Sequence, residues 1–411
     1  MKKNGLFDPL TLPNGTQIKN RMAKASMEEN LADENHAPGK ALIQLYRTWA
    51  EGGAGLIITG NVMVDRHALT GPKCMVLDTD RSLGQFKALA EACRRHGAQA
   101  WMQINHPGRQ LMADMGQEAV GPSAIAVNIS GLKNVFAVPR ALNEQDIENL
   151  INRYAQCAVL AYQSGFTGVQ VHAAHGYLFS QFLSPLSNTR TDRWGGTIEN
   201  RARILLSTLD AIRARVPKNF CLAVKLNSAD FQRGGFGAAD AARVVQMLNE
   251  KAVDLVEISG GSYESPAMQG ETRDGSTLAR EAYFLEFAQT IGKVAGMPIM
   301  VTGGIRRKPV AQRVIEGAVS MVGMATALAI EPALPRHWQN GNDVEVAPLI
   351  VPWKNKVYAS VAMSSLVKRQ MKLLSLGKPT NLKISPLWVF MGDQLSNRCQ
   401  TRRYQKWIAN A

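Results

Sequence analysis

The sequence has few cysteines and no long apolar run, and each shortage excludes a class of protein. The five cysteines lie far apart, without the C-x-x-C spacing of zinc sites and iron–sulfur clusters: Cys74, Cys93, Cys157, Cys221 and Cys399. We therefore expect reduced, buried thiols, and neither a disulfide framework nor a metal site. No stretch approaches the roughly 18 apolar residues of a membrane-spanning helix, and the segment Met1–Leu10 has no apolar core of the kind that a signal peptide requires. These shortages favour a cytoplasmic protein.

The composition is that of a globular enzyme, but its charge is unevenly distributed. Of the 411 residues, 45% are hydrophobic and 19% charged, which is enough to bury a large core and excludes disorder. Residues 354–411 contain 11 lysines and arginines and a single acid, Asp393, whereas residues 1–353 contain 36 basic and 32 acidic side chains. The formal net charge of +14 therefore belongs mainly to the end of the chain. Because no nucleic-acid-binding motif accompanies it, we do not expect nucleic acid as a partner.

Short aliphatic runs alternate with segments of helical periodicity, which is typical of βαβ units around a parallel sheet. The helical segments include residues 146–164 and 199–215, and the first begins with acids that suit a helix amino terminus. The Pro-Asn-Gly turn at Leu12–Gly15 predicts a small hairpin at the bottom of a barrel. The predicted strands are Arg21–Ala25, Gly55–Thr59, Ala98–Ile104, Gly168–His172, Leu222–Leu226, Leu255–Ile258, Pro298–Thr302 and Met321–Gly323.

Eight such strands predict an α/β protein with the (β/α)8 TIM barrel fold. The βα rhythm stops near Asn340–Asp343, so we predict a barrel at residues 1–340 and a basic, helical extension at residues 341–411. In the extension, Lys368, Arg369 and Lys372 are interleaved with apolar residues at helical spacing: Val357, Val361, Leu366, Met371 and Leu374. Two interpretations fit this pattern. One is a helix that covers the barrel with its lysines in solvent, and the other is a weak contact with an anionic membrane or partner surface.

In barrels of this kind, catalytic groups follow the carboxyl ends of the strands. Directly after the fourth predicted strand, His172, His175 and Tyr177 occur within six residues. Two imidazoles suit hydrogen bonding to an oxygen anion, and a phenol suits proton donation. The same spacing also fits side chains that cap a helix or fill the core, so the residue types alone favour neither interpretation.

The longer segment around these residues is far more specific. It reads His-Ala-Ala-His-Gly-Tyr-Leu from His172, followed by Ser-Pro-Leu-Ser-Asn-x-Arg-x-Asp-x-Trp-Gly-Gly-x-x-Glu-Asn-Arg up to Arg201. This block resembles the Old Yellow Enzyme family of NAD(P)H:flavin oxidoreductases, and the resemblance covers residues 7–335. Further matches occur in the same order as in the family: Asn20-Arg21, Ala25-Ser26-Met27, Gly55-Leu-Ile-Ile-Thr-Gly-Asn61, Gln103 with His106-Pro-Gly-Arg109, Lys225 and Thr302-Gly303-Gly304.

The resemblance implies an FMN cofactor and assigns its contacts. Gln103 would bind the pyrimidine edge of the flavin, and Lys225 would stabilise the negative charge that reduced flavin acquires. Lys225 also has a plainer interpretation, as a barrel lysine paired with an acid. Gly303 and Gly304 would bring bare backbone close to the phosphate. The full set of implied cofactor contacts is Ala25, Ser26, Met27, Asn61, Gln103, Lys225, Gly303, Gly304, Ala325 and Thr326.

The chain departs from the family pattern at two places. Where members have a Gly-Arg pair that holds the phosphate, this chain has Ala325-Thr326, so backbone amides there and the nearby Arg306 or Arg307 would have to compensate. Where many members have a proline and a flavin-tuning thiol or hydroxyl group, this chain has Ser26 and Glu28. An ionised Glu28 beside the flavin would lower its reduction potential.

By resemblance, NADH or NADPH reduces FMN, which then passes hydride to an activated alkene such as an α,β-unsaturated carbonyl compound. His172 and His175 would hold the carbonyl oxygen, and Tyr177 would supply the proton. Flavin reductase or NADH oxidase activity is the alternative within the family. Two other classes compete with an ene-reductase: a non-catalytic flavin-binding scaffold acting through its basic tail, and an unrelated phosphate-binding barrel lyase. Family members commonly self-associate, although no residue here decides the number of subunits.

Overall fold

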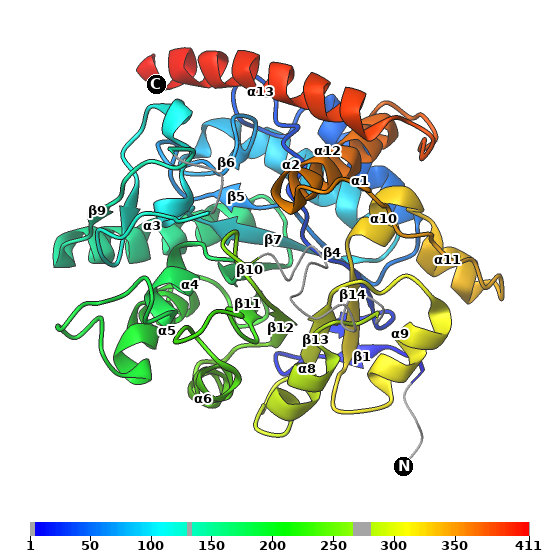
Figure 1. The fold of residues 1–411 in the computed structure, drawn as a ribbon. Helices are drawn as coiled ribbons and strands as arrows, with labels where there is room; N and C mark the ends of the chain where they lie inside the picture. The colour runs from blue at the N-terminus through cyan, green and yellow to red at the C-terminus, as the bar shows by residue number, and fades with distance from the viewer. Residues whose placement is uncertain (1–4, 130–133, 266–280, 411) are drawn as a thin grey trace.

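The computed structural model describes residues 5–129, 134–265 and 281–410 of the chain (Figure 1). Residues 1–4, at the start of the amino-terminal segment considered above, lie outside the described part. Among the described residues, none of the helices combines the length and the apolar character that crossing a lipid bilayer requires.

Eight parallel strands form a closed barrel. Their hydrogen-bonded order follows the sequence, and the circle closes where the last strand pairs with the first. Each strand lies at one of the predicted runs, so all eight predicted strands and the predicted (β/α)8 barrel are confirmed. The strands are β3 (Met22–Lys24), β4 (Leu56–Ile58), β7 (Gln99–Asn105), β10 (Gly168–Ala173), β11 (Cys221–Asn227), β12 (Leu255–Ser259), β13 (Ile299–Thr302) and β14 (Met321–Met324).

The register of these strands brings polar side chains together. Gln170 on β10 lies opposite Gln103 on β7, and His172, two residues further along β10, lies opposite Lys225 on β11. Lys225 lies in turn opposite Glu257 on β12. Since side chains alternate between the two faces of a strand, Gln170 and His172 share a face. Polar groups from four neighbouring strands therefore form adjacent layers inside the barrel.

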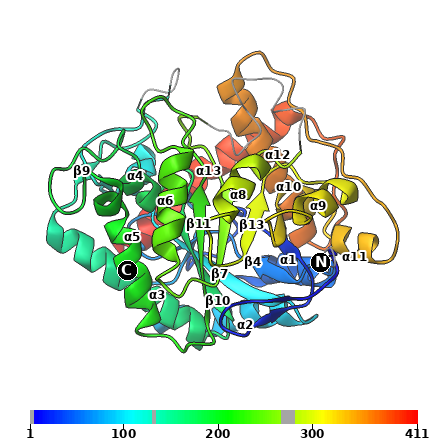
Figure 2. The ribbon, with the colours of Figure 1, turned by 90° about the horizontal axis from the view of Figure 1, so that it is seen from below.

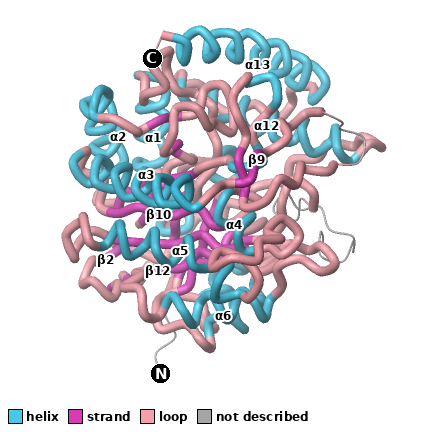
Figure 3. The backbone as a smooth tube through the Cα atoms, turned by 90° about the vertical axis from the view of Figure 1, so that its left-hand side faces the viewer, coloured by secondary structure: helices cyan, strands magenta, loops and turns pink. Residues whose placement is uncertain are grey.

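Helices surround the barrel, and local capping explains where the two predicted ones begin. The side chain of Asn143 accepts a hydrogen bond from the N–H of Asp146 at the start of α3, and Thr197 does the same for Asn200 in α5. Figure 3 shows α3 and α5 side by side outside the strands. The helices on the barrel are α1 (Lys40–Glu51), α2 (Leu83–Arg94), α3 (Glu144–Gln163), α4 (Leu178–Leu183), α5 (Ile198–Arg213), α6 (Ala238–Leu248), α8 (Leu285–Gly292), α9 (Lys308–Ile315), α10 (Thr326–Ile330) and α11 (Leu334–Gln339).

The predicted hairpin is present at the bottom of the barrel. Strands β1 (Leu10–Thr11) and β2 (Gln17–Ile18) pair antiparallel, and their buried leucine and isoleucine side chains pack under the barrel strands. In Figure 2 this segment, in dark blue, lies at the lower end of the strands, whereas α12, in orange, lies at the upper end. Short strand pairs complete the sheet structure: β5 (Val62–Met63) with β6 (Met75–Val76), and β8 (Val120–Gly121) with β9 (Arg140–Ala141).

The C-terminal extension folds into two helices that pack on the barrel. Helix α12 (Lys356–Ser375) contacts α1, α10 and α13 (Pro386–Ala409) (Figure 1). Tyr404 of α13 is fully buried against Met63 and Leu69. Helix α12 therefore covers the barrel, as one of the two interpretations of the extension expected. Its Lys368 is not surrounded by solvent, however, because it forms an ion pair with Glu28 of the barrel.

One expectation about the cysteines is wrong. Four of the thiols are buried, as expected, but Cys399 is exposed because it lies on the outer side of α13, away from the barrel.

Candidate active site

A cavity of about 410 Å³ opens at the carboxyl ends of the barrel strands, within the size range of small-molecule sites. The structure brings most of the predicted site residues to it: Ser26, Met27, His175, Tyr177, Lys225, Gly303, Gly304, Ala325 and Thr326 line the wall. Helix α12 contributes another part of the wall, with Met363, Val367 and Lys368 among its residues. The remaining predicted residues, Ala25, Asn61, Gln103 and His172, are buried and outside the lining set.

Gln103 begins a chain of buried hydrogen bonds across the barrel. Its Oε1 accepts from Ser26 Oγ at 2.7 Å, and its Nε2 donates to Gln170 Oε1 at 2.8 Å. Gln170 Nε2 donates in turn to Glu257 Oε2 at 2.7 Å. Because each partner fixes the next, the orientation of the Gln103 amide is set from the loop after β3 through to β12.

Lys225 lines the cavity and is also paired with an acid. Its Nζ lies 2.9 Å from Glu257 Oε1, which also accepts a hydrogen bond from Thr302 Oγ1 at 2.6 Å. Glu257 is fully buried and Lys225 nearly so. A buried carboxylate of this kind is stable only with such partners, so the cation is held in place at the cavity wall by Glu257.

The two histidines are neutral, for a clear physical reason. Burial lowers the pKa of both imidazoles well below the ordinary value. The next causes are His175 and then Lys225 for His172, and Lys225 for His175. His172 Nδ1 accepts a hydrogen bond from the N–H of Ala174 at 3.3 Å, so its single proton is on Nε2, where it can be donated to a ligand. His175 differs, because its Nε2 lies 2.7 Å from Ser259 Oγ. That contact must give way before the same nitrogen can bind a substrate oxygen.

Tyr177 keeps its proton and has a phenol partner. Burial and the charges of Tyr263 and Glu28 raise its pKa well above the ordinary value, so the hydroxyl group stays protonated at neutral pH. Its oxygen lies 2.9 Å from the hydroxyl oxygen of Tyr263. Its ring centroid is 4.9 Å from that of His172. The proton donor at the cavity wall therefore lies beside the buried imidazole of His172.

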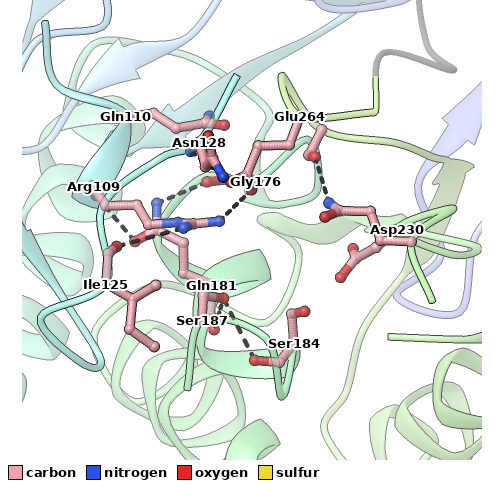
Figure 4. A network of polar contacts seen from close by, with 12 residues as sticks. Arg109, Gln110, Ile125, Asn128, Gly176, Gln181, Ser184, Ser187, Asp230 and Glu264 are labelled. Atoms are coloured by element: carbon pink, nitrogen blue, oxygen red, sulfur yellow. Dashed lines mark hydrogen bonds and ion pairs between the residues drawn. The ribbon is translucent and has the colours of Figure 1, made fainter. Parts of the chain in front are cut away.

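An ion pair holds the loop that carries Tyr263. Arg109, in the short 3-10 helix Gly108–Gln110 after β7, donates to Glu264 at 2.5 Å and to the backbone oxygen of Ala126 at 3.0 Å. Figure 4 shows the Arg109 side chain pointing toward Glu264, with Ile125 and Gly176 close by. Since Glu264 directly follows Tyr263 in the chain, Arg109 fixes the position of the second phenol.

The opposite end of the cavity is suited to a phosphate. Gly303 and Gly304 have φ angles of +134° and +70°, which L side chains rarely adopt, so bare backbone lies at the wall here. Arg306 lines the cavity as well, and its guanidinium is 3.0 Å from Glu281. Arg307 pairs with the same Glu281 at 2.7 Å but lies outside the lining set. Of the two arginines considered as replacements for the missing Gly-Arg pair, Arg306 is therefore the one at the site.

Several residues of the site were not found from the sequence, among them Glu257, Ser259 and Tyr263. Glu257 is the acid in the apolar strand β12, and an acid within a buried run was the available signal. Ser259 and Tyr263 follow at the end of that strand. Nothing local marks them, because their roles depend on His175 and Tyr177, which lie some 85 residues earlier.

Comparison with known proteins assigns a family to most of this chain. The family model described as the NADH:flavin oxidoreductase / NADH oxidase family matches residues 5–345. The NADH-dependent flavin oxidoreductase of Hypocrea jecorina (strain QM6a) is 37% identical over 359 residues, which are 82% of this chain and 89% of that protein. The corresponding protein of Neonectria sp. (strain DH2) is 39% identical over 356 residues, or 80% of this chain. The NADH oxidase of Thermoanaerobacter brockii is 32% identical over 338 residues, or 81% of this chain. The chain spans only 46% and 50% of the length of these last two relatives.

Solved structures of similar fold agree with this assignment. A 2-naphthoyl-CoA reductase matches with a TM-score of 0.74 and 29% identity, over 82% of this chain and 52% of the other. An old yellow enzyme homologue from Zymomonas mobilis matches with a TM-score of 0.71 and 24% identity, over 84% of this chain and 95% of the other. The second likeness concerns the barrel fold alone.

Proposed function

Because the chain belongs to the NADH:flavin oxidoreductase / NADH oxidase family, a family of oxidoreductases, we propose that it is an FMN-dependent enzyme that uses NADH or NADPH to reduce an activated alkene. An α,β-unsaturated carbonyl compound is the substrate class that suits the site best. The observation that carries the proposal is that Tyr177 and Lys225 line one cavity, with the neutral imidazole of His172 buried beside Tyr177.

The residues present fit FMN. A cation at Lys225, the hydroxyl group of Ser26 and the amide of Gln103 suit the polar edge of the flavin, and bare backbone at Gly303–Gly304 with Arg306 suits its phosphate. When bound, FMN supplies the hydride that it receives from the nicotinamide cofactor. Lys225 would favour this chemistry by placing positive charge where negative charge develops.

The substrate end of the cavity supplies polarisation and a proton. His172 would donate from Nε2 to the carbonyl oxygen and so stabilise the enolate that forms. Tyr177 would transfer its hydroxyl proton to the α-carbon, and the raised pKa of this phenol suits a strongly basic acceptor. His175 would assist His172 once its contact with Ser259 opens.

A visible absorption spectrum of the purified protein, followed by anaerobic titration with NADH and NADPH, tests this function. We expect flavin bands that a nicotinamide bleaches and that 2-cyclohexenone restores. A protein that stays colourless after reconstitution with FMN refutes the cofactor assignment. Flavin that is bleached but not restored by any enone tested refutes the alkene-reductase assignment alone.

The alternative to alkene reduction is an activity in which the electrons of NADH pass to oxygen or to free flavin. The name of the Thermoanaerobacter relative, NADH oxidase, is the specific observation in its favour. Oxygen consumption with NADH that exceeds enone reduction in the same preparation would support it, whereas enone turnover that survives in air would support the alkene reductase.

A further inference from the structure

A carboxylate lies in the wall of the cavity in which we propose that FMN binds. One oxygen of this carboxylate is hydrogen-bonded by residues in loops of the barrel. Glu28 directly follows the predicted flavin-contacting loop Ala25–Met27 and lines the cavity. Its Oε2 accepts a hydrogen bond from Thr70 Oγ1 at 2.9 Å, and Thr70 Oγ1 accepts one from Asn61 Nδ2 at 3.0 Å. The predicted contact residue Asn61 therefore reaches the cavity wall through Thr70 and Glu28.

The other oxygen is bound by the C-terminal extension. Lys368 Nζ, from α12, donates to Glu28 Oε1 at 3.2 Å, and Lys368 lines the cavity too. The two side chains keep only 23% and 21% of their surface exposed, so the pair is largely removed from water. Lys368 lies beyond residue 345, where the match to the family model ends. The cation therefore comes from a segment that the family model does not include.

The surroundings keep both members of the pair charged. Burial acts to raise the pKa of Glu28, but the charge of Lys368 and hydrogen bonds from Thr70 and Lys368 outweigh it, and the pKa is lowered. Burial acts to lower the pKa of Lys368, but Glu28 and then Asp393 raise it. The ionisable groups that face this pair from the neighbouring elements are Tyr177 after β10, Tyr263 after β12, Cys74 before β6 and Asp393 on α13.

A neutral pair has a different effect on a flavin than a lone carboxylate. Reduced flavin carries negative charge, which an unpaired Glu28 in the cavity wall would repel. We propose, on the basis of the function proposed above, that Lys368 is a positioning residue contributed by the extension: it holds Glu28 in a neutral ion pair at the cavity wall and so keeps the cofactor easy to reduce. The expectation that Glu28 lowers the flavin potential then applies only to a chain without Lys368.

The midpoint potential of bound FMN tests this role in the full-length protein. We expect Lys368→Met to shift the equilibrium at least tenfold toward oxidised flavin, a lowering of about 30 mV for a two-electron couple. Lys372→Met is the matched control, because Lys372 lies one turn further along α12, is exposed and is not among the residues that line the cavity described above. We expect it to leave the equilibrium within twofold of the wild type. The double variant Glu28→Gln/Lys368→Met removes both charges and should return to within threefold of the wild type.

Three results would overturn the proposal: an unchanged potential in Lys368→Met, the same shift in Lys372→Met, or a double variant that stays as low as Lys368→Met. If Lys368→Met fails to hold FMN, FMN affinity becomes the measured quantity. Recovery of binding in the double variant supports the proposal, and loss in both variants contradicts it.

The FMN-free protein provides a second readout. We expect thermal unfolding to occur at a lower temperature in Lys368→Met than in the double variant, because the single variant leaves a carboxylate without its cation. Equal melting temperatures would contradict the pairing. A wild-type protein that binds FMN, with variants of unchanged potential, refutes only the role of Lys368, whereas a wild type that binds no FMN refutes the function itself.

Discussion

Replacement of Lys225 by methionine would reveal how strongly the cavity wall depends on a single buried ion pair. The variant leaves Glu257 fully buried without its cation, although Thr302 and Gln170 still donate to its two oxygens. Removing one partner of a buried pair costs about 3–5 kcal/mol. Because these two hydrogen bonds remain, we expect about 3 kcal/mol, the lower end of that range.

Urea unfolding of the FMN-free protein, followed by both circular dichroism and fluorescence, measures the effect. Lys251→Met is the matched control, since Lys251 pairs with the exposed Asp210 at 2.7 Å, and such surface pairs contribute about 0–1 kcal/mol. The double variant Lys225→Met/Glu257→Gln should recover most of the loss. Equal losses for Lys225→Met and Lys251→Met, or a double variant as unstable as Lys225→Met, would refute the reasoning.

Three further predictions follow from other parts of the structure. Tyr177→Phe should slow reoxidation of the flavin by an enone by about 10²-fold or more, while the rate of flavin reduction by NADH stays within a few-fold of the wild type. Stopped-flow traces of the two half-reactions check this. Tyr263→Phe, which keeps the Tyr177 proton, should have the smaller effect. Burial lowers the pKa of His106 from 6.5 to about 4, so the unfolded chain binds the proton first and the folded protein loses stability as the pH falls through this range. His106→Asn should lack about 3 kcal/mol of that acid destabilisation in melting curves recorded at several pH values. The same loss of stability with pH in the wild type and the variant would contradict this prediction. Tyr404→Ala, at a fully buried position, should lower the free energy of unfolding by about 3–5 kcal/mol. Trp388→Ala, on the exposed side of the same helix, should lower it by under about 0.5 kcal/mol. Equal melting temperatures for the two variants would show that α13 does not stabilise the barrel.

The barrel was predictable because its strands carry strong local signals. Parallel strands that are buried on both sides read as short aliphatic runs, and each run here lies beside helical periodicity. The sequence determined the boundaries of the helices less well. Helix α3 begins at Glu144, two residues before the predicted start, because its cap is Asn143 and not the acids that follow.

The site was predictable as a set of residues but not as a set of partners. His172, His175 and Tyr177 follow one strand in a specific motif, so their neighbourhood could be inferred. The partners that decide their chemistry come from other strands: Ser259 next to His175, and Tyr263 next to Tyr177. Such contacts depend on strand register and loop geometry, and single residue types in a loop carry no signal for either.

The C-terminal extension shows that the number of basic residues in a segment does not tell which groups surround those residues in the folded protein. The count of 11 basic residues against one acid suggested either solvent or an anionic surface as their surroundings. Packing of α12 on the barrel instead brings one of these cations, Lys368, beside a barrel carboxylate, Glu28, that is 340 positions away in the chain. The pair is possible only because α12 closes one side of the cavity. In the role proposed for Lys368, the extension acts on the flavin site through this one contact, and the positive charge of its other side chains does not contribute to that effect.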